Sequence, residues 1–177
     1  MGPGSLALGH DVKTWVIGEC EFERGNRSVE EMSKERRLLS VFRIPVRWSD
    51  MDANAHVNNA TYFTYFEQAR IEWLERIGMQ NTADGEGPVV VQTSCNFKAP
   101  IPYPEMLEVR VYGGAPGRTS FPTFYEIVGT LGAGVKYADG QAVMVWTDRR
   151  SGKSRSVPAA LRALLGTSGD GVGEIAK

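Results

Sequence analysis

Between Ala60 and Ile77, apolar residues recur at the spacing of an α-helix. Neither Gly nor Pro interrupts this stretch before Gly78, which stands at a C-cap position, so about five turns can form. One helix face collects the apolar side chains: Tyr62, Phe66, Ala69, Trp73 and Ile77, with Phe63, Tyr65 and Leu74 at its sides. Because only a narrow polar strip remains, the pattern predicts a long helix that the rest of the protein wraps.

Alternating apolar and polar positions, which are typical of strands, precede and follow this helix. The first run covers residues 38–48, where Pro45 favours an edge or a bulge. Four more runs follow in a meander: residues 88–99, 106–113, 120–131 and 136–148, with a candidate tight turn at Asp139–Gly140, before a short helix at 158–165. An antiparallel sheet must cover its apolar face, so the pattern predicts an α+β fold in which a curved sheet wraps one long central helix.

Length and composition describe one ordinary globular domain with tails. The 177 residues divide into an expected loosely packed N-terminal tail (1–38), a domain (39–165) and a flexible C-terminal tail (166–177). A net charge of −1 gives no electrostatic reason to expect a nucleic-acid or membrane partner. No signal-peptide pattern opens the sequence and no apolar run reaches the roughly 20 residues of a membrane span. A cytoplasmic location is therefore expected.

The polar residues just before the long helix are the candidate chemistry: Asp50, Asp52, His56, Asn58 and Asn59. A helix start offers unpaired N–H groups and a positive dipole end, so an active site is predicted at this junction. Asn58 is the expected N-cap, and Asp50 is better explained as a loop or capping residue than as a catalytic one. His56 could orient substrate or water, or brace the loop. The two cysteines and two histidines form no metal-ligand cluster.

Two charged residues of the helix lie away from its polar strip. Arg70 falls on the apolar side and Glu67 on its margin. An ion pair or a subunit contact would account for both, because charged groups are seldom buried unless paired.

The segment Asp50–Asn59, read Asp-Met-Asp-Ala-Asn-Ala-His-Val-Asn-Asn, is followed by Tyr62, by Tyr-Phe-Glu at 65–67 and by Ala-Arg at 69–70. It resembles the signature of hotdog-fold acyl-CoA thioesterases, in the 4-hydroxybenzoyl-CoA thioesterase branch. The His-Val-Asn-Asn part is also similar to plant and bacterial acyl-carrier-protein thioesterases. Residues 97–101, 103–104, 152–154 and 157–158 fit the same pattern. The resemblance covers about residues 39–165 and implies the hotdog fold, dimers with active sites at the subunit interface, and often tetramers.

The resemblance also implies roles. The second aspartate of the motif, Asp52, would be the catalytic base or nucleophile, and the backbone N–H of Asn59 would polarise the thioester carbonyl. His56 is included in the catalytic set, and Asn58 and Tyr62 are expected to contact substrate. A second hotdog branch uses a glutamate on the central helix, which places Glu67 among the candidates. No metal and no organic cofactor are expected, since coenzyme A is part of the substrate.

Three functions stay open from the sequence. The first is hydrolysis of a fatty or aromatic acyl-CoA. The second is hydrolysis of an acyl-carrier-protein thioester, which a basic docking patch would favour. The third is non-catalytic acyl-CoA binding by a ligand-responsive repressor. A repressor needs a DNA-binding module, and residues 1–38 are too short and too mixed in charge for a convincing helix-turn-helix. A homodimer or homotetramer is expected.

Overall fold

The computed structural model describes residues 36–79, 85–132 and 134–166. Its elements follow in this order: β1 (Arg37–Pro45), the 3-10 helix η1 (Trp48–Asp50), α1 (Asn59–Arg76), β2 (Glu86–Phe97), β3 (Met106–Gly113), β4 (Ser120–Gly129), β5 (Lys136–Asp148) and α2 (Ala159–Leu165). The predicted five strands and two helices are confirmed, with ends that differ by up to three residues. The predicted tails lie outside the described residues, apart from residue 166 and residues 36–38, of which Arg37 and Leu38 belong to β1.

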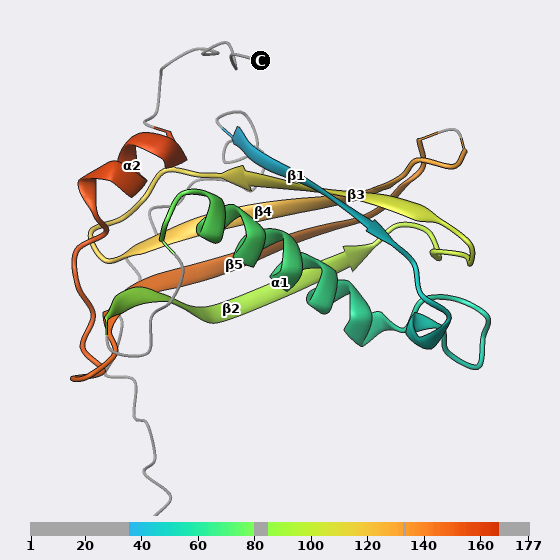
Figure 1. Cartoon of the computed structure of the whole chain (residues 1–177), viewed down its shortest axis with the longest axis horizontal. Coiled ribbons are helices and arrows are strands. Elements are labelled where there is room, and N and C mark those ends of the chain that lie inside the picture. The colour runs from blue at the N-terminus through green and yellow to red at the C-terminus, as the bar shows by residue number, and fades with distance from the viewer. Residues whose placement is uncertain (1–35, 80–84, 133, 167–177) are drawn as a thin grey trace, which may run out of the picture.

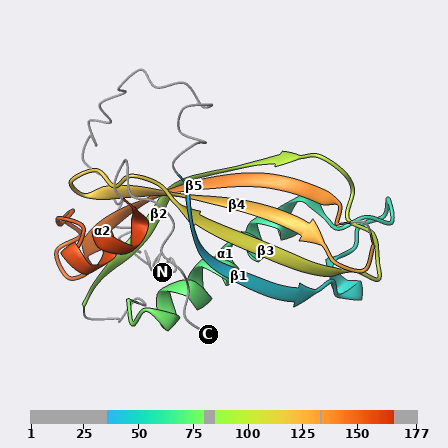
Figure 2. The same cartoon turned by 90° about the horizontal axis from the view of Figure 1, so that it is seen from above.

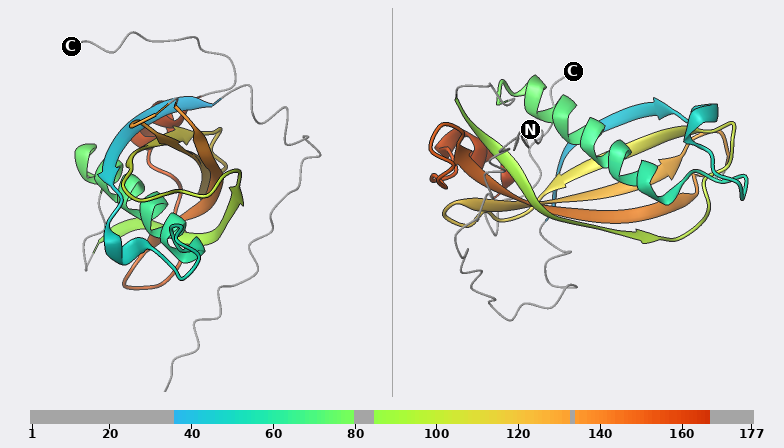
Figure 3. Two further views of the ribbon diagram at one scale, coloured as in Figure 1. Left: turned by 90° about the vertical axis from the view of Figure 1, so that its right-hand side faces the viewer. Right: turned by 90° about the horizontal axis from the view of Figure 1, so that it is seen from below.

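The five strands form one antiparallel sheet in the order β1-β3-β4-β5-β2. Pro45, which lacks an N–H donor, lies at the end of the edge strand β1, where the loss of a ladder bond is tolerated. The 18-residue helix α1 runs along one face of the sheet (Figure 1). The short helix α2 lies near one end of the sheet, and α1 starts near the other end (Figure 2). Seen along α1, the strands curve around the helix (Figure 3).

The prediction of a tight turn at Asp139–Gly140 is wrong. Both residues continue β5, where Gly140 pairs with Tyr125 on β4 and with Cys95 on β2. A Cβ atom at this position would overlap the ring of Phe66 on α1. Asp-Gly is a local turn signal, but here the glycine is needed because the helix approaches the strand closely.

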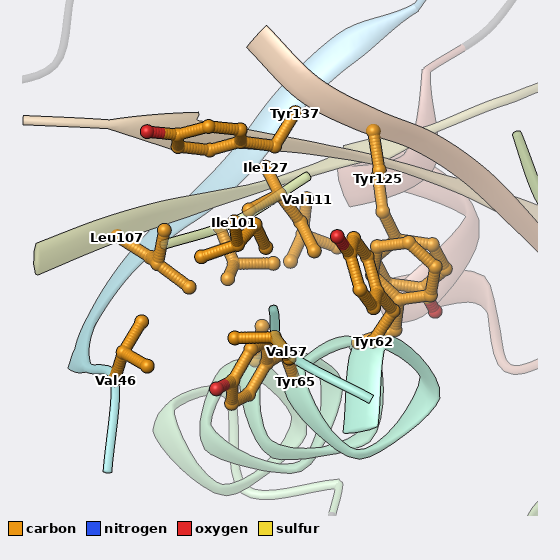
Figure 4. Close-up of a cluster of buried hydrophobic side chains, with 14 of the residues drawn as sticks. Val46, Val57, Tyr62, Tyr65, Ile101, Leu107, Val111, Tyr125, Ile127 and Tyr137 are labelled. Carbon is orange, nitrogen blue, oxygen red and sulfur yellow. The ribbon is translucent and has the colours of Figure 1, made fainter. Parts of the chain in front are cut away.

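The core lies between α1 and the concave face of the sheet. Tyr65, Phe66 and Ala69 on α1 are buried against strand residues such as Leu107 and Ile127 (Figure 4). A second cluster joins the C-terminal end of α1 to α2: Trp73, Leu74, Phe121, Met144, Trp146, Val157, Leu161 and Leu165. The predicted buried face of α1 is therefore confirmed, except that Phe63 is exposed and Ile77 half-buried in the single chain. Each fully buried large side chain contributes about 2 kcal/mol.

Candidate active site

A short antiparallel bridge shapes the loop that precedes α1. Met51 pairs with Val57, so the two sides of the loop are held together. The N–H of Asp52 donates to the carbonyl of His56 at 2.8 Å, and the N–H of Asn58 donates to the carbonyl of Asp50 at 2.8 Å. These bonds place the two carboxylates of the motif at defined positions relative to the helix start.

Two further features complete the loop. Ala55 has a φ of +60°, in the left-handed region that closes a tight turn. The N–H of Val57 donates to the carbonyl of Ile101 at 3.0 Å, which attaches the loop to the segment after β2. The loop is therefore braced by segments that lie far apart in the sequence.

The first residue of α1, Asn59, has a backbone N–H without a partner in the described chain. The side chain of Asn58 accepts the N–H of Ala60 at 2.9 Å, and its carbonyl accepts the N–H of Thr61 at 2.9 Å. The predicted N-cap is thus confirmed. Across the described ranges, no acceptor faces the N–H of Asn59. An acceptor placed there would also meet the positive end of the helix dipole.

A cavity of about 330 Å³ opens at this helix start. Its walls come from the loop, the first turn of α1 and the segment after β2: Asp52, Asn54, His56, Val57, Asn59, Tyr62, Phe97, Lys98, Ala99 and Pro100. Four predicted site residues therefore meet at one cavity: Asp52, His56, Asn59 and Tyr62. Asn58 and Glu67 are not part of its lining. Glu67 is exposed on α1, more than two turns after Asn59, and its substrate role stays a prediction.

Asp50 and Asp52 have opposite environments. Asp52 is half-buried, and one of its oxygens, Oδ1, accepts the N–H of Asn54 at 2.7 Å. Within the described part of the chain its second oxygen has no hydrogen bond, so it can bind water or substrate. Asp50 is 4% exposed, and Arg47 and Tyr65 occupy both of its oxygens. Burial alone would raise the pKa of Asp50, but these hydrogen bonds lower it below its usual range.

Tyr62 and Phe97 form the apolar side of the cavity. Tyr62 is 2% exposed, and its ring meets the edge of Phe97 with centroids 4.9 Å apart at 89°. Burial raises the pKa of the Tyr62 hydroxyl, which therefore stays protonated at neutral pH. Lys98 adds a positive charge to the lining, and its Nζ lies 3.4 Å from Oδ2 of Asp139. The cavity thus combines an apolar wall, a carboxylate and a cation.

Sequence reasoning missed several lining residues. Asn54 lies inside the recognised loop, but its spacing alone did not distinguish it from a turn residue. Phe97, Lys98 and Pro100 belong to the later motif, which matched the family but was not assigned to the site. The hydrogen bond from Val57 to Ile101 and the ring contact of Tyr62 with Phe97 hold this segment at the helix start, and a single sequence does not show these contacts.

Arg70 contacts a hydroxyl and not the acid of an ion pair, and the other expected explanation, a subunit contact, stays a prediction. Its guanidinium donates to the hydroxyl of Tyr125 at 3.1 Å, on the sheet side of α1. That hydroxyl also lies 2.7 Å from the hydroxyl of Thr123. The half-buried charge is thus satisfied in part by neutral groups of β4, and no ion pair of Arg70 or Glu67 occurs between residues of the described chain.

The described residues hold no group of three or more His, Cys, Asp or Glu side chains that could bind a metal ion. Cys95 is a free, half-buried thiol, and burial raises its pKa to about 11. The other cysteine, Cys20, lies outside the described residues. Among the described helices, none is long and apolar enough to cross a membrane.

The sequence model of the thioesterase-like superfamily matches residues 46–165, which include the loop, α1 and all strands after it. The chain therefore belongs to the thioesterase-like superfamily, and its class is that of a thioester hydrolase.

Three solved structures illustrate the likeness. The PA2801 protein of Pseudomonas aeruginosa, provisionally described as a thioesterase, is 35% identical with a TM-score of 0.68 and covers 73% of this chain and 100% of its own. A Xanthomonas campestris protein, provisionally described as an acyl-CoA thioesterase, is 37% identical with a TM-score of 0.58, covering 63% and 95%. A Thermus thermophilus thioesterase in complex with coenzyme A and zinc is 27% identical with a TM-score of 0.61, covering 72% and 92%.

Proposed function

We propose that this chain hydrolyses an acyl-CoA thioester to the free acid and coenzyme A. One observation carries the proposal: a carboxylate oxygen of Asp52 and the N–H of Asn59, both without protein partners in the described chain, lie at the same cavity. The carboxylate can activate a water nucleophile or act as the nucleophile itself, and the N–H can stabilise negative charge on the carbonyl oxygen. Thioester hydrolysis needs both.

In this mechanism the thioester carbonyl oxygen accepts a hydrogen bond from the N–H of Asn59. Asp52 then removes a proton from water as water attacks the carbonyl carbon, or it attacks that carbon itself and forms an anhydride that water hydrolyses. The carbon–sulfur bond breaks, the coenzyme A thiolate leaves, and it takes up a proton. The helix N-terminus stabilises the oxyanion in both routes, and one such donor is worth about 3 kcal/mol.

Other residues at the helix start have roles in the same proposal. Tyr62 and Phe97 would contact the acyl group, which is fatty or aromatic, and His56 would orient substrate or water. Asn58, which does not line the cavity, would assist from the N-cap position. Lys98 offers a charge to the anionic coenzyme. The Xanthomonas and Thermus structures, named for acyl-CoA hydrolysis and for bound coenzyme A, support the coenzyme as the carrier.

We place the chain, as part of this proposal, in the 4-hydroxybenzoyl-CoA thioesterase branch of the hotdog fold, with α1 as its central helix. The chain would then act without a metal or an organic cofactor, and as a homo-oligomer.

A panel of thioesters tests the proposal. Short, medium and long acyl-CoAs, benzoyl-type CoAs and one acyl-carrier-protein thioester are assayed by release of free thiol. At least one acyl-CoA is expected to be hydrolysed with a kcat/KM in the usual range of about 10⁴–10⁸ M⁻¹s⁻¹. Rates near background for every CoA ester would sink the proposal, and turnover of the carrier-protein ester alone would transfer the reaction to that carrier.

A further inference from the structure

A buried polar contact joins α1 to the loop that carries Asp52. Asp50 is 4% exposed and Tyr65 is fully buried. The Tyr65 hydroxyl donates to Oδ2 of Asp50 at 2.8 Å. In Figure 4 the Tyr65 ring rises from α1 beside Val57, with its hydroxyl on the side where Val46 lies. Because both groups are removed from water, breaking this bond costs more free energy than breaking an exposed one.

Arg47 holds the same carboxylate from the other side. Its backbone N–H donates to Oδ2 of Asp50 at 2.8 Å, and its guanidinium donates to Oδ1 through Nε at 3.1 Å and through a terminal nitrogen at 2.9 Å. Burial and the neighbouring carboxylate raise the pKa of Tyr65, so its hydroxyl remains a donor. Asp50 is therefore a fixed point, with donors from both the loop and the helix.

Backbone hydrogen bonds transmit the position of Asp50 to both halves of the proposed site. The carbonyl of Asp50 accepts the N–H of Asn58, the residue directly before the Asn59 donor. On the other side Asp50 is followed by Met51, which pairs with Val57, and then by Asp52. A shift of Asp50 would thus move the carboxylate and the helix start relative to each other.

We infer that Asp50 and Tyr65 are positioning residues, whose hydrogen bond sets the spacing between the Asp52 carboxylate and the Asn59 N–H. The inference rests on the proposed function. The helix α1 contributes at two points, because its first residue supplies the oxyanion donor and its seventh holds the loop that carries the base. A misplacement of about 1 Å can lower a rate about a hundredfold. Removing one of several anchors is therefore expected to lower kcat about tenfold.

Tyr65→Phe tests the inference, because it deletes the hydroxyl and keeps the ring in the core. Tyr137→Phe is the matched control. The Tyr137 hydroxyl also donates to a buried carboxylate, that of Glu105, at 2.8 Å, and within the described chain neither side chain bonds to Asp50 or Asp52. Both variants lose one buried tyrosine–carboxylate bond, so thermal unfolding should show similar losses of stability. Only Tyr65→Phe should lower kcat about tenfold, with KM within about twofold.

A double-variant cycle separates positioning from a general loss of structure. If Tyr65 acts through Asp52, then Tyr65→Phe should have little further effect on kcat in an Asp52→Asn background. A tenfold loss that persists in that background would overturn the inference, because the hydroxyl would then act independently of the base.

A second pair keeps the test valid if Tyr65→Phe folds poorly. Arg47→Gln replaces a largely exposed side chain and removes its ion pair with Asp50. Arg43→Gln removes the ion pair between Arg43 on β1 and Glu108 on β3 and serves as the control. Arg47→Gln should lower kcat several-fold and Arg43→Gln should not. Equal rates in both members of the tyrosine pair, or of the arginine pair, contradict the inference. Failure of the wild-type chain on all thioesters would instead reject the proposed function.

Discussion

Two aspartates only two residues apart behave differently because of what surrounds them. Asp50 is buried and receives hydrogen bonds on both oxygens, whereas Asp52 lines the cavity and keeps one oxygen unbound within the described chain. A base or nucleophile needs a free lone pair, which Asp50 lacks. The environment, not the side-chain type, therefore separates the structural carboxylate from the one proposed to be catalytic.

The first prediction concerns the charge of Asp52. Asp52→Asn keeps shape and hydrogen bonding but removes the charge needed for attack or proton removal. We expect kcat to fall about a hundredfold or more, with KM within a few-fold, because general base catalysis is typically worth about 10²–10⁴-fold. Steady-state kinetics on the best acyl-CoA of the panel measures both constants.

Asp50→Asn should lower kcat far less than Asp52→Asn. Glu67→Gln should give an intermediate loss if Glu67 orients water. An inactive Glu67→Gln protein beside a nearly fully active Asp52→Asn protein would assign the chemistry to the helix carboxylate instead.

The second prediction concerns Glu105, a carboxylate 8% exposed at the start of β3. Burial alone would raise the pKa of Glu105, but hydrogen bonds from the N–H of Leu131, the Tyr137 hydroxyl and the N–H groups of Met106 and Thr130 lower it. A folded-state pKa below the unfolded value means that Glu105 stabilises the protein above about pH 4.3. That contribution is lost as the pH falls through the lower folded-state pKa.

Glu105→Gln should therefore reduce the free energy of unfolding at pH 7 by about 1–3 kcal/mol and make its decline in acid shallower. Urea titrations at pH 7, 4 and 3 measure this. Glu75→Gln, at an exposed position on α1, serves as the control and should match the wild type at each pH. A Glu105→Gln curve parallel to the wild-type curve would show that Glu105 does not titrate on unfolding in this range.

At the scale of elements, the distance between α1 and β5 depends on one glycine. Phe66 packs over Gly140 and stacks on Tyr125, with ring centroids 4.7 Å apart and an interplanar angle of 21°. The same helix turn carries Tyr62 into the cavity and Tyr65 toward Asp50. Helix–sheet contact in the core and geometry at the helix start are therefore parts of one packing arrangement.

The third prediction tests this contact. Gly140→Ala places a methyl group in the Phe66 ring and should destabilise the protein by about 1–3 kcal/mol through overpacking. Gly132→Ala is the matched control, since no atom lies within 4 Å of a Cβ there. It should stay within about 0.5 kcal/mol of the wild type. Thermal and urea unfolding give both values, and equal stability of the two variants would contradict the packing argument.

For the whole molecule, the open feature is the pair of sheet edges. Strands β3, β4 and β5 are paired on both sides, so among the described strands β1 and β2 are the two at the edges. Along β2 three consecutive valines, Val89, Val90 and Val91, are exposed by 36–43%. An exposed apolar edge strand favours pairing with another chain.

The fourth prediction is that the protein is at least a homodimer at micromolar concentration, as a dimer or a tetramer. Val91→Lys, which charges the β2 edge, should shift it toward the monomer. Val41→Lys on β1, at a similarly exposed valine, should leave the assembly intact. Sedimentation velocity decides the outcome, and a monomeric wild-type chain would contradict the prediction.

The sequence alone determined what depends on local periodicity and capping. The order of strands, the long helix and the Asn58 cap follow from side-chain alternation and from the hydrogen bonds that short polar residues offer to nearby N–H groups. The Asp-Met-Asp and His-Val-Asn-Asn motif also placed the candidate site at the helix start. These features are readable because the residues that make them lie within a few positions of one another.

Only the tertiary structure decided what depends on contacts distant in sequence. Gly140 lies in a strand and not in a turn because Phe66, more than seventy positions earlier in the chain, requires the space. Phe97 and Lys98 join the cavity because contacts of Val57 with Ile101 and of Tyr62 with Phe97 hold their segment at the helix start. Both oxygens of Asp50 are hydrogen-bonded because Tyr65 and Arg47 lie beside it. Burial and hydrogen-bond partners are properties of the packed chain, so no local pattern carries them.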